Sequence, residues 1–300
     1  MAGRLDPRFH AYRDDLAAED LRGRVPARRF VAGTCRRVRV GAAPLRRAPR
    51  PDALLDTELL FGEGFTVFED RDGWAWGQSR IDGYVGYVPS AALAEDLVEP
   101  THRVAALRTF LTPAPELKCP PDDGLAMNGL VAVAEVGDRY CRLATGGWVF
   151  AAHLAPLGEP EPDFVAVARR FLGVPYLWGG RTSLGLDCSG LVQLALQAAG
   201  IACPRDSDIQ AAVVGRAIAS PDPGRLERGD LVFLPDHAGF VEDGGLLLHA
   251  NARDMAVSLH PLAEVLAREQ RLHGHGIMAV RRLAALSAAP AAAGQMQRPY

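Results

Sequence analysis

The sequence predicts an α+β fold in the C-terminal half of the chain, with two small β-barrels before it. Short strands broken by Asp-Gly turns fill residues 36–98, and a weaker copy of this pattern covers residues 99–157. The linker GEPEPD, residues 158–163, is rich in proline and acidic residues and indicates a domain boundary. Beyond it the order changes to helices first and strands later, which is typical of helices packed at one end of an antiparallel sheet.

The two β-rich blocks are related to each other. In the first block, Asp70-Arg-Asp-Gly73 and Ile81-Asp-Gly83 each contain the Asp-Gly pair that closes a tight hairpin. The second block has the same order of strands and turns as the first, which indicates an internal repeat. The matching segments are LVAVAEVGDRYCRLATGGWVFAAHL in the second block and FTVFEDRDGWAWGQSRIDGYVGYVPSAAL in the first. Two copies are too few for a solenoid, so we expect two closed barrels. The pattern resembles a pair of bacterial SH3-type barrels.

The C-terminal block, residues 158–286, begins with two expected helices. In PDFVAVARRFLG, Phe164, Val167 and Phe171 recur at helical spacing. Residues 188–200 are apolar nearly all round and end at Gly200, which predicts a buried helix. Strands are expected to follow in DLVFL, HAGFVED, GLLLHA, MAVSLH and IMAVRRL.

Two terminal segments lie outside these domains. In residues 1–35, the stretch RDDLAAEDLRG predicts a short helix packed across domains, and the absence of an apolar h-region argues against a signal peptide. Residues 287–300 have no periodic pattern and are expected to be disordered. Since no segment approaches 18 uninterrupted apolar residues, we expect no membrane span and no membrane partner. Cysteines without a disulfide pattern and the missing h-region predict a cytoplasmic location.

Composition and charge narrow the possible functions. The chain of 300 residues has a formal net charge of −3, which gives no basic excess of the kind that marks nucleic-acid binding. Its five cysteines are odd in number and never form C-x-x-C, so the sequence supports neither a disulfide framework nor a four-thiolate zinc site. Four of them are expected to be small core side chains: Cys35, Cys119, Cys141 and Cys203.

The fifth cysteine lies in GLDCSGLV, where Cys188 opens the second expected helix and Asp187 lies near its cap. Free N–H groups and the helix dipole at that position favour a thiolate. A thiolate nucleophile needs a base and a group that orients the base. His237 and His249 fit these roles, because a hairpin with its turn at residues 242–245 would bring them side by side.

A zinc site formed by Cys188, His237 and His249 is the alternative for the same residues. Nothing near them suggests the carboxylates that usually orient zinc ligands, so we expect no metal and no organic cofactor. The remaining histidines are given no role: His10, His102, His153, His260, His273 and His275.

These motifs together resemble the NlpC/p60 family of cysteine peptidases. The resemblance rests on LGVPYLWGGRTSLGLDCSGLVQLALQAAGI followed by RGDLVFL, HAGFV and LLHA. It implies a papain-like core, with Cys188 as nucleophile, His237 as base and His249 as the orienting residue. It also implies that the phenol of Tyr176 helps to bind the oxyanion, together with the Cys188 backbone N–H.

The barrels extend the resemblance to γ-D-glutamyl dipeptidyl peptidases that carry two SH3-type domains. In such enzymes the first barrel closes one end of the cleft and binds the free amine of an N-terminal L-Ala. The resemblance assigns Tyr84 to this contact, with Glu63 as the candidate acidic partner. It also implies substrate contacts from four residues near the nucleophile: Asp187, Ser189, Asp206 and Ser207. The Asp206-Ser207 pair has an alternative role as the cap of a helix over SDIQAAVV.

The expected reaction is release of L-Ala-γ-D-Glu from a free murein peptide during cell-wall recycling. Unpaired acceptors in a closed cleft would reject stems that lack a free amine. Two alternatives stay open, which are an envelope endopeptidase acting on intact wall and a non-catalytic peptidoglycan-binding protein. The sequence leaves open the third substrate residue, diaminopimelate or lysine, and the oligomeric state.

Overall fold

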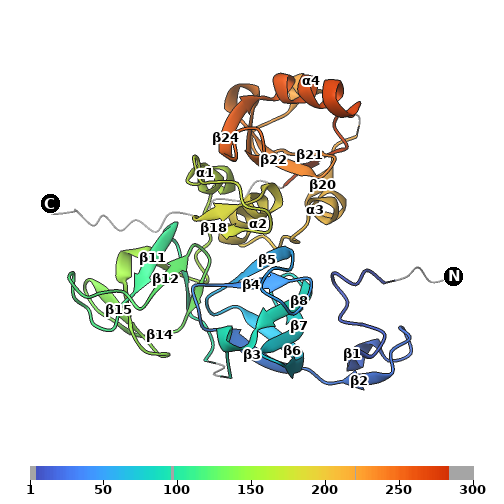
Figure 1. The fold of residues 1–300 in the computed structure, drawn as a ribbon. Coiled ribbons are helices and arrows are strands. Elements are labelled where there is room, and N and C mark those ends of the chain that lie inside the picture. The colour runs from blue at the N-terminus through green and yellow to red at the C-terminus, as the bar shows by residue number, and fades with distance from the viewer. Residues whose placement is uncertain (1–4, 96–97, 220, 284–300) are drawn as a thin grey trace.

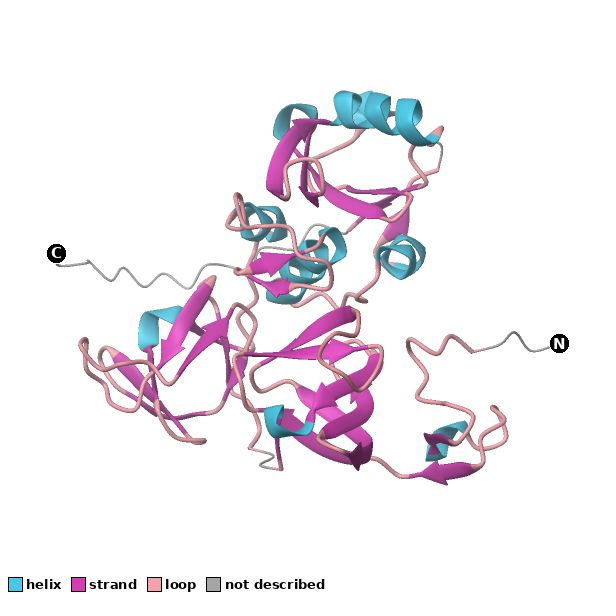
Figure 2. Ribbon diagram, viewed as in Figure 1, coloured by secondary structure: helices cyan, strands magenta, loops and turns pink. Residues whose placement is uncertain are grey.

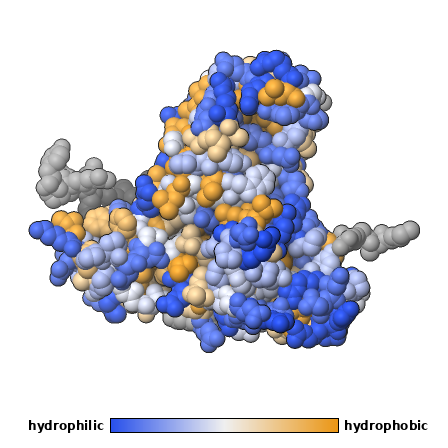
Figure 3. All heavy atoms as spheres, viewed as in Figure 1, coloured by the Kyte–Doolittle hydropathy of each residue, from blue (hydrophilic) through white to orange (hydrophobic). Residues whose placement is uncertain are grey.

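The computed structural model describes residues 5–95, 98–219 and 221–283 (Figure 1). A domain of a six-stranded sheet, a two-stranded sheet and several helices lies above two β-rich units. The N-terminal segment lies beside the first of these units (Figures 1 and 2). The predicted disordered tail, residues 287–300, lies outside the described residues. No helix of the described part of the chain combines the length and the apolar character needed to cross a bilayer. Figure 3 shows apolar residues scattered among hydrophilic ones over the visible face.

The first β-rich unit is a single seven-stranded sheet in the order β5-β4-β8-β7-β6-β3-β9. Its hairpin between β6 and β7 turns at Asp72 and Gly73, which both have positive φ (52° and 81°), as the Asp-Gly signal predicts. Phe65, Leu45 and Leu59 lie fully buried in its core. The strands are β3 (Thr34–Val38), β4 (Ala42–Arg46), β5 (Leu55–Leu60), β6 (Gly64–Arg71), β7 (Trp74–Ser79), β8 (Val85–Pro89) and β9 (Leu93–Ala94).

The second β-rich unit consists of three small sheets around a separate apolar core that includes Val104, Leu125 and Val149. The sheets have the orders β13-β10-β17, β11-β12 and β14-β15-β16. That this unit is a second SH3-type barrel stays a prediction. Its strands are β10 (His102–Val104), β11 (Arg108–Leu111), β12 (Asp123–Ala126), β13 (Leu130–Val131), β14 (Val133–Val136), β15 (Tyr140–Leu143), β16 (Trp148–Phe150) and β17 (Leu154–Pro156).

The N-terminal segment is strand and turn, so the short helix predicted for RDDLAAEDLRG is wrong. Leu16–Ala18 forms β1, which pairs in parallel with β2 (Arg29–Val31), and Glu19–Leu21 is a single 3₁₀ turn. Leu16 and Ala18 pack with Trp76 of the first unit. Pairing with a distant strand and burial against an aromatic ring therefore outweigh the local helix propensity.

The C-terminal domain has a six-stranded antiparallel sheet in the order β20-β25-β21-β22-β23-β24, which confirms the predicted strands. The helix α2 (Cys188–Ala198) packs against β22 and β23 and is buried on nearly every side, as predicted. It ends before Gly200, whose φ of 74° reverses the chain direction. The strands are β18 (Arg181–Thr182), β19 (Gly185–Leu186), β20 (Arg216–Ala217), β21 (Leu231–Leu234), β22 (His237–Glu242), β23 (Leu246–Asn251), β24 (Ala256–Pro261) and β25 (Ala279–Arg282).

Three further helices complete this domain: α1 (Phe164–Arg169), α3 (Ser207–Val213) and α4 (Leu262–His273). The predicted first helix is shorter than its apolar pattern, but Phe171 still lies fully buried beyond its end. The helix α4 was not predicted. Only its Leu262 and Val265 are buried, so its apolar stripe is too narrow to give a clear periodic signal.

Two arginines of the C-terminal domain reach the first barrel and are fully buried there. Arg181 forms an ion pair with Glu63 at 3.0 Å and donates to the Glu58 carbonyl oxygen at 2.7 Å. Arg205 donates to the Thr57 hydroxyl at 2.8 Å. Since a buried cation is costly unless it is paired, these contacts fix how the domain docks on the barrel.

We predict that the variant Arg181→Ala unfolds more easily by about 3–5 kcal/mol, because Glu63 is left as an unpaired buried charge. Denaturant unfolding followed by tryptophan fluorescence would measure the loss. The double variant Arg181→Met with Glu63→Leu removes both charges and should recover most of the stability. Equal losses in the single and double variants would contradict the importance of the pair.

Candidate active site

A cavity of about 280 Å³ lies where the N-terminal segment, the first barrel and the C-terminal domain meet. The N-terminal segment contributes one arginine to its wall, and the barrel contributes an acid, an arginine and a tyrosine. The C-terminal domain contributes the cysteine that begins α2 and the residues around it. The lining residues are Arg8, Arg47, Asp56, Tyr84, Tyr176, Trp178, Asp187, Cys188, Ser189, Asp206, Ser207, Asp208 and Asp236.

Cys188 is the first residue of α2, and the Asp187 side chain caps that helix by accepting from the Gly190 N–H at 2.8 Å. The thiol is nearly buried, and its Sγ contacts the carbonyl oxygen of Asp236 at 3.9 Å. The structure thus places the sulfur beside the residue that precedes His237. Catalytic hydrogen bonds often form only in the substrate complex, so this contact leaves a sulfur–imidazole bond to be made at that stage.

His237 and His249 lie side by side on neighbouring strands, with His237 Nε2 only 2.7 Å from His249 Nδ1. His249 Nε2 in turn lies 2.9 Å from Nδ1 of His260, on β24. Both nitrogens of His249 are therefore already used in contacts with other imidazoles. This arrangement suits an orienting residue, and it leaves His249 without a lone pair for the alternative zinc site.

Burial opposes charge on both the thiol and the neighbouring imidazole. Burial, with a smaller effect of the Asp187 charge, raises the pKa of Cys188 to about 12. Burial lowers the pKa of His237 to about 4. The expected resting thiolate at the helix N-terminus is therefore wrong, because desolvation exceeds the dipole effect. Both shifts favour the neutral forms of the thiol and of the ring.

Tyr176 lies in the cavity wall with Cys188, next to the β-bridge that its backbone forms with Leu186. Burial, with a smaller effect of the Asp187 charge, raises the pKa of its phenol. The phenol therefore keeps its proton at neutral pH and can donate a hydrogen bond to an oxyanion.

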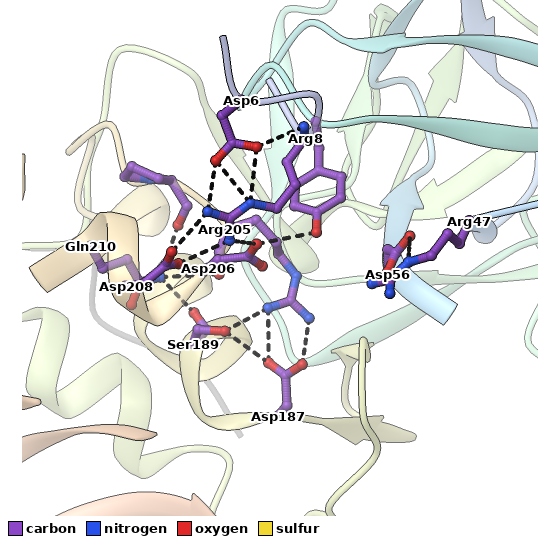
Figure 4. Close-up of polar contacts among 12 residues, drawn as sticks. Asp6, Arg8, Arg47, Asp56, Asp187, Ser189, Arg205, Asp206, Asp208 and Gln210 are labelled. Carbon is purple, nitrogen blue, oxygen red and sulfur yellow. Dashed lines mark hydrogen bonds and ion pairs between the residues drawn. The ribbon is translucent and has the colours of Figure 1, made fainter. Parts of the chain in front are cut away.

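Asp187 and Ser189, predicted to contact substrate, line the cavity but are held by the protein itself (Figure 4). Arg205 donates to the two Asp187 carboxylate oxygens at 2.9 and 2.7 Å and to the Ser189 hydroxyl at 2.8 Å. Asp187 also accepts from the Gly179 N–H at 2.8 Å. These bonds fix the N-terminus of α2, and with it the position of Cys188.

Asp206 faces the cavity, together with the predicted Ser207 and Tyr84. Its Oδ2 accepts from the Tyr84 hydroxyl at 3.1 Å and from Arg8 at 2.8 Å (Figure 4). Although Asp206 is at the N-cap position of α3, its side chain makes no capping bond. The helix-cap alternative therefore does not describe this carboxylate.

Glu63 does not line this cavity, so its prediction as the acidic partner of a substrate amine is wrong. Its carboxylate is 2 % exposed and is used by Arg181 and by the Leu60 N–H at 2.9 Å. Asp56 of β5 lies in the wall instead, paired with Arg47 at 2.6 Å. Sequence reasoning missed Asp56, although its place in the alternating strand LLDTELL was visible.

Arg8 and Asp208 were also missed. Arg8 forms bonds with three carboxylates, those of Asp6, Asp206 and Asp208 (Figure 4). The N–H of Val85 donates to the Arg8 carbonyl oxygen at 2.8 Å, which ties the segment to the barrel. Only the fold joins residues so distant in sequence, so no local pattern could have revealed them.

Comparison with known proteins agrees with this architecture. Residues 173–275 match the NlpC/P60 family, and residues 45–93 match the bacterial dipeptidyl-peptidase SH3 domain. The second match covers the first β-rich unit, so one SH3 domain is shown. The chain therefore carries an SH3 domain and an NlpC/P60 domain, and it is a hydrolase of the cysteine-peptidase class.

Individual relatives match over most of the chain. It is 27 % identical over 254 residues to the γ-D-glutamyl-L-lysine dipeptidyl-peptidase of Bacillus subtilis, covering 73 % of this chain and 80 % of the relative. The enzyme of the same name from Bacillus cereus is 24 % identical, with 69 % and 71 % covered. A solved NlpC/P60 family protein from Bacillus cereus has the same fold, with a TM-score of 0.70 and 22 % identity over 83 % of this chain and 99 % of that chain.

We predict that peptidase activity persists to an unusually low pH. Because the pKa of His237 is about 4, the ring stays able to accept a proton above that pH and loses this ability as pH falls through about 4. The acid limb of kcat/KM, which reports the free enzyme, should lie well below the value of about 6.5 of an ordinary histidine. Circular dichroism over the same range would separate titration from unfolding. An acid limb near the ordinary value would contradict a buried, neutral base.

Proposed function

We propose that this cysteine hydrolase cleaves the γ-D-glutamyl–diamino acid bond of free murein peptides and releases L-Ala-γ-D-Glu. The single observation that carries the proposal is the composition of the cavity wall beside Cys188. There Asp56 and Tyr84 of the first barrel and Asp206 of the C-terminal domain line the same cavity as the cysteine. The names of the two Bacillus relatives support the same bond and the same mode of cleavage.

The proposed reaction has two steps. The Cys188 sulfur attacks the γ-carbonyl carbon while His237 takes the thiol proton, and Tyr176 with the Cys188 N–H stabilises the oxyanion. His237 then gives that proton to the leaving amine, the C–N bond breaks, and a thioester forms. Water, deprotonated by His237, attacks the thioester, and the dipeptide leaves as the free thiol is restored. His249 holds the His237 ring throughout.

The substrate ammonium would bind near Asp56, Tyr84 and Asp206. The Asp56 side chain is 7 % exposed, whereas its partner Arg47 is 65 % exposed. Arg47 can therefore move into solvent and leave the carboxylate to the ammonium. A substrate that displaced Arg47 without supplying a positive charge would leave a nearly buried carboxylate unpaired, which is costly.

This wall also argues against the two other candidate functions. A stem peptide attached to sugar has no free amine and would have to extend through Arg8, Arg47 and Asp56. A purely binding role would not need a cysteine beside paired imidazoles. We place the reaction in the cytoplasm, where murein peptides with free amino termini accumulate during wall recycling. Both lysine and diaminopimelate stay candidates for the third substrate residue.

We predict that N-acetylation of L-Ala-γ-D-Glu-diaminopimelate lowers kcat/KM by at least about 100-fold, because the acceptors lose their charged donor. Product masses from free and acetylated peptides, incubated with equal amounts of enzyme, would measure this difference. Equal cleavage of both peptides would refute the dipeptidyl mode while leaving hydrolysis itself intact.

The variant Asp56→Asn should raise KM for the free peptide by about 10- to 100-fold, since it removes one charge-assisted bond. Steady-state kinetics would measure it. The matched control is Asp52→Asn, because Asp52 is also paired with an arginine of the barrel but is exposed and outside the cavity wall. A KM equal to that of the control would assign the amine site elsewhere.

The variant Cys188→Ala should lose turnover entirely and keep the fold, because one sulfur atom in a capped helix contributes little to packing. Product release and thermal unfolding would be measured on the same sample. Residual turnover at the level of the unchanged enzyme would refute the nucleophile assignment.

A further inference from the structure

The contacts that begin at His237 continue past His249 to two residues that have no role in the scheme above. Nδ1 of His260 lies 2.9 Å from His249 Nε2, and Nε2 of His260 lies 3.1 Å from Asp254 Oδ2. His249 and His260 come from the paired strands β23 and β24, with rings at 88° to each other. Three imidazoles and one carboxylate thus form a continuous series.

The carboxylate at the end of this series is held in place. Ser258 Oγ donates to Asp254 Oδ2 at 2.6 Å, and Asn251 Nδ2 donates to Ser258 Oγ at 2.7 Å. The backbone N–H of Asp254 donates to Asn251 Oδ1 at 3.0 Å. The bond from Ser258 keeps the pKa of Asp254 below its usual value. At neutral pH this carboxylate is therefore ionised and can only accept.

The Asp254 carboxylate, an acceptor at one end of the series, determines which nitrogen of each imidazole carries a proton. With the three rings neutral, His260 Nε2 carries the proton that faces Asp254, so its Nδ1 is an acceptor. His249 Nε2 must then carry the proton that bonds it, which makes His249 Nδ1 an acceptor too. His237 Nε2 is consequently protonated, and its Nδ1 keeps a lone pair. That nitrogen is the one free to take a proton from Cys188.

The opposite arrangement of protons would prevent His237 from acting as a base. If every proton moved to the other nitrogen, His237 Nδ1 would carry one and could not accept another. His260 Nε2 would then turn a lone pair towards the Asp254 carboxylate, and two acceptors repel. The carboxylate therefore selects the productive arrangement from a distance of three rings.

We propose that His260 and Asp254 are positioning residues that hold His237 in the tautomer able to deprotonate Cys188. The inference rests on the proposed roles of Cys188 and His237. Neither residue lines the cavity beside Cys188, and neither gives up a proton during turnover. The negative charge of Asp254 also favours the imidazolium that forms on His237 as the sulfur attacks.

The test uses the full chain and the free L-Ala-γ-D-Glu-diaminopimelate peptide. The variant Asp254→Asn removes the negative charge that faces His260 and puts an N–H in place of one oxygen, so it selects the productive arrangement less strongly. We expect kcat to fall about 10- to 100-fold with KM unchanged, less than the ~10⁴-fold loss seen when an orienting carboxylate in direct contact with the base becomes an amide. The variant His260→Leu should show a similar loss.

The variant His260→Gln is the rescue, because its amide oxygen can accept from His249 while its N–H donates to Asp254. It should recover most of the lost kcat. The matched control is His273→Gln, because His273 lines a second cavity together with His237, His249 and His260 but lies outside the series. Unchanged kcat in both Asp254→Asn and His260→Leu would overturn the proposal, as would equal losses in His260→Gln and His260→Leu.

A second readout does not depend on turnover. Imidazole ¹⁵N chemical shifts at neutral pH should show Nε2–H on His237, His249 and His260 in the unchanged protein, and a shift towards Nδ1–H in Asp254→Asn. Unaltered tautomers in that variant would also overturn the proposal. If the unchanged protein fails to release the dipeptide, the proposed function fails, while these shifts still test the tautomer series.

Discussion

The buried ion pair between Asp187 and Arg205 is the contact on which the rest of the site depends. Asp187 caps α2 and so places Cys188, while Arg205 joins that carboxylate to Ser189 on one side and to Thr57 of the first barrel on the other. A guanidinium that is 1 % exposed would be very costly without these partners. The position of the nucleophile and the docking of the barrel are therefore set by the same charge.

The cavity follows from that docking. Its wall needs Arg8 from the N-terminal segment, Asp56 and Tyr84 from the barrel, and Asp206 from α3. Arg8 pairs with Asp206 and with Asp208, another acid of the wall, and the exposed Arg47 pairs with Asp56. The barrel and the segment are thus part of the chemistry of the site, because they decide which charges face the cysteine.

The reacting groups are kept neutral by burial, and this sets what the surrounding groups must do. A thiol with a pKa of about 12 beside an imidazole with a pKa of about 4 gives no ion pair at rest. In the proposed reaction, charge appears only as the sulfur attacks, and hydrogen-bond donors and a correctly protonated ring must stabilise it. The series from His237 to Asp254 supplies such a ring through geometry that is already in place.

The sequence by itself determined the parts whose signals are local. The apolar helix closed by Gly200, the Asp-Gly hairpins and the spacing of His237 and His249 depend on residues close together in the chain, so their outcome could be predicted. Only the tertiary structure decided that Glu63 pairs with Arg181 while Asp56 faces the cavity. Glu63 and Asp56 are both acidic residues of the first barrel, and their surroundings in sequence are similar. The tertiary structure also decided the protonation of Cys188, because desolvation depends on how many distant atoms cover the sulfur, and the place of His260, whose partners become neighbours only when three strands pair.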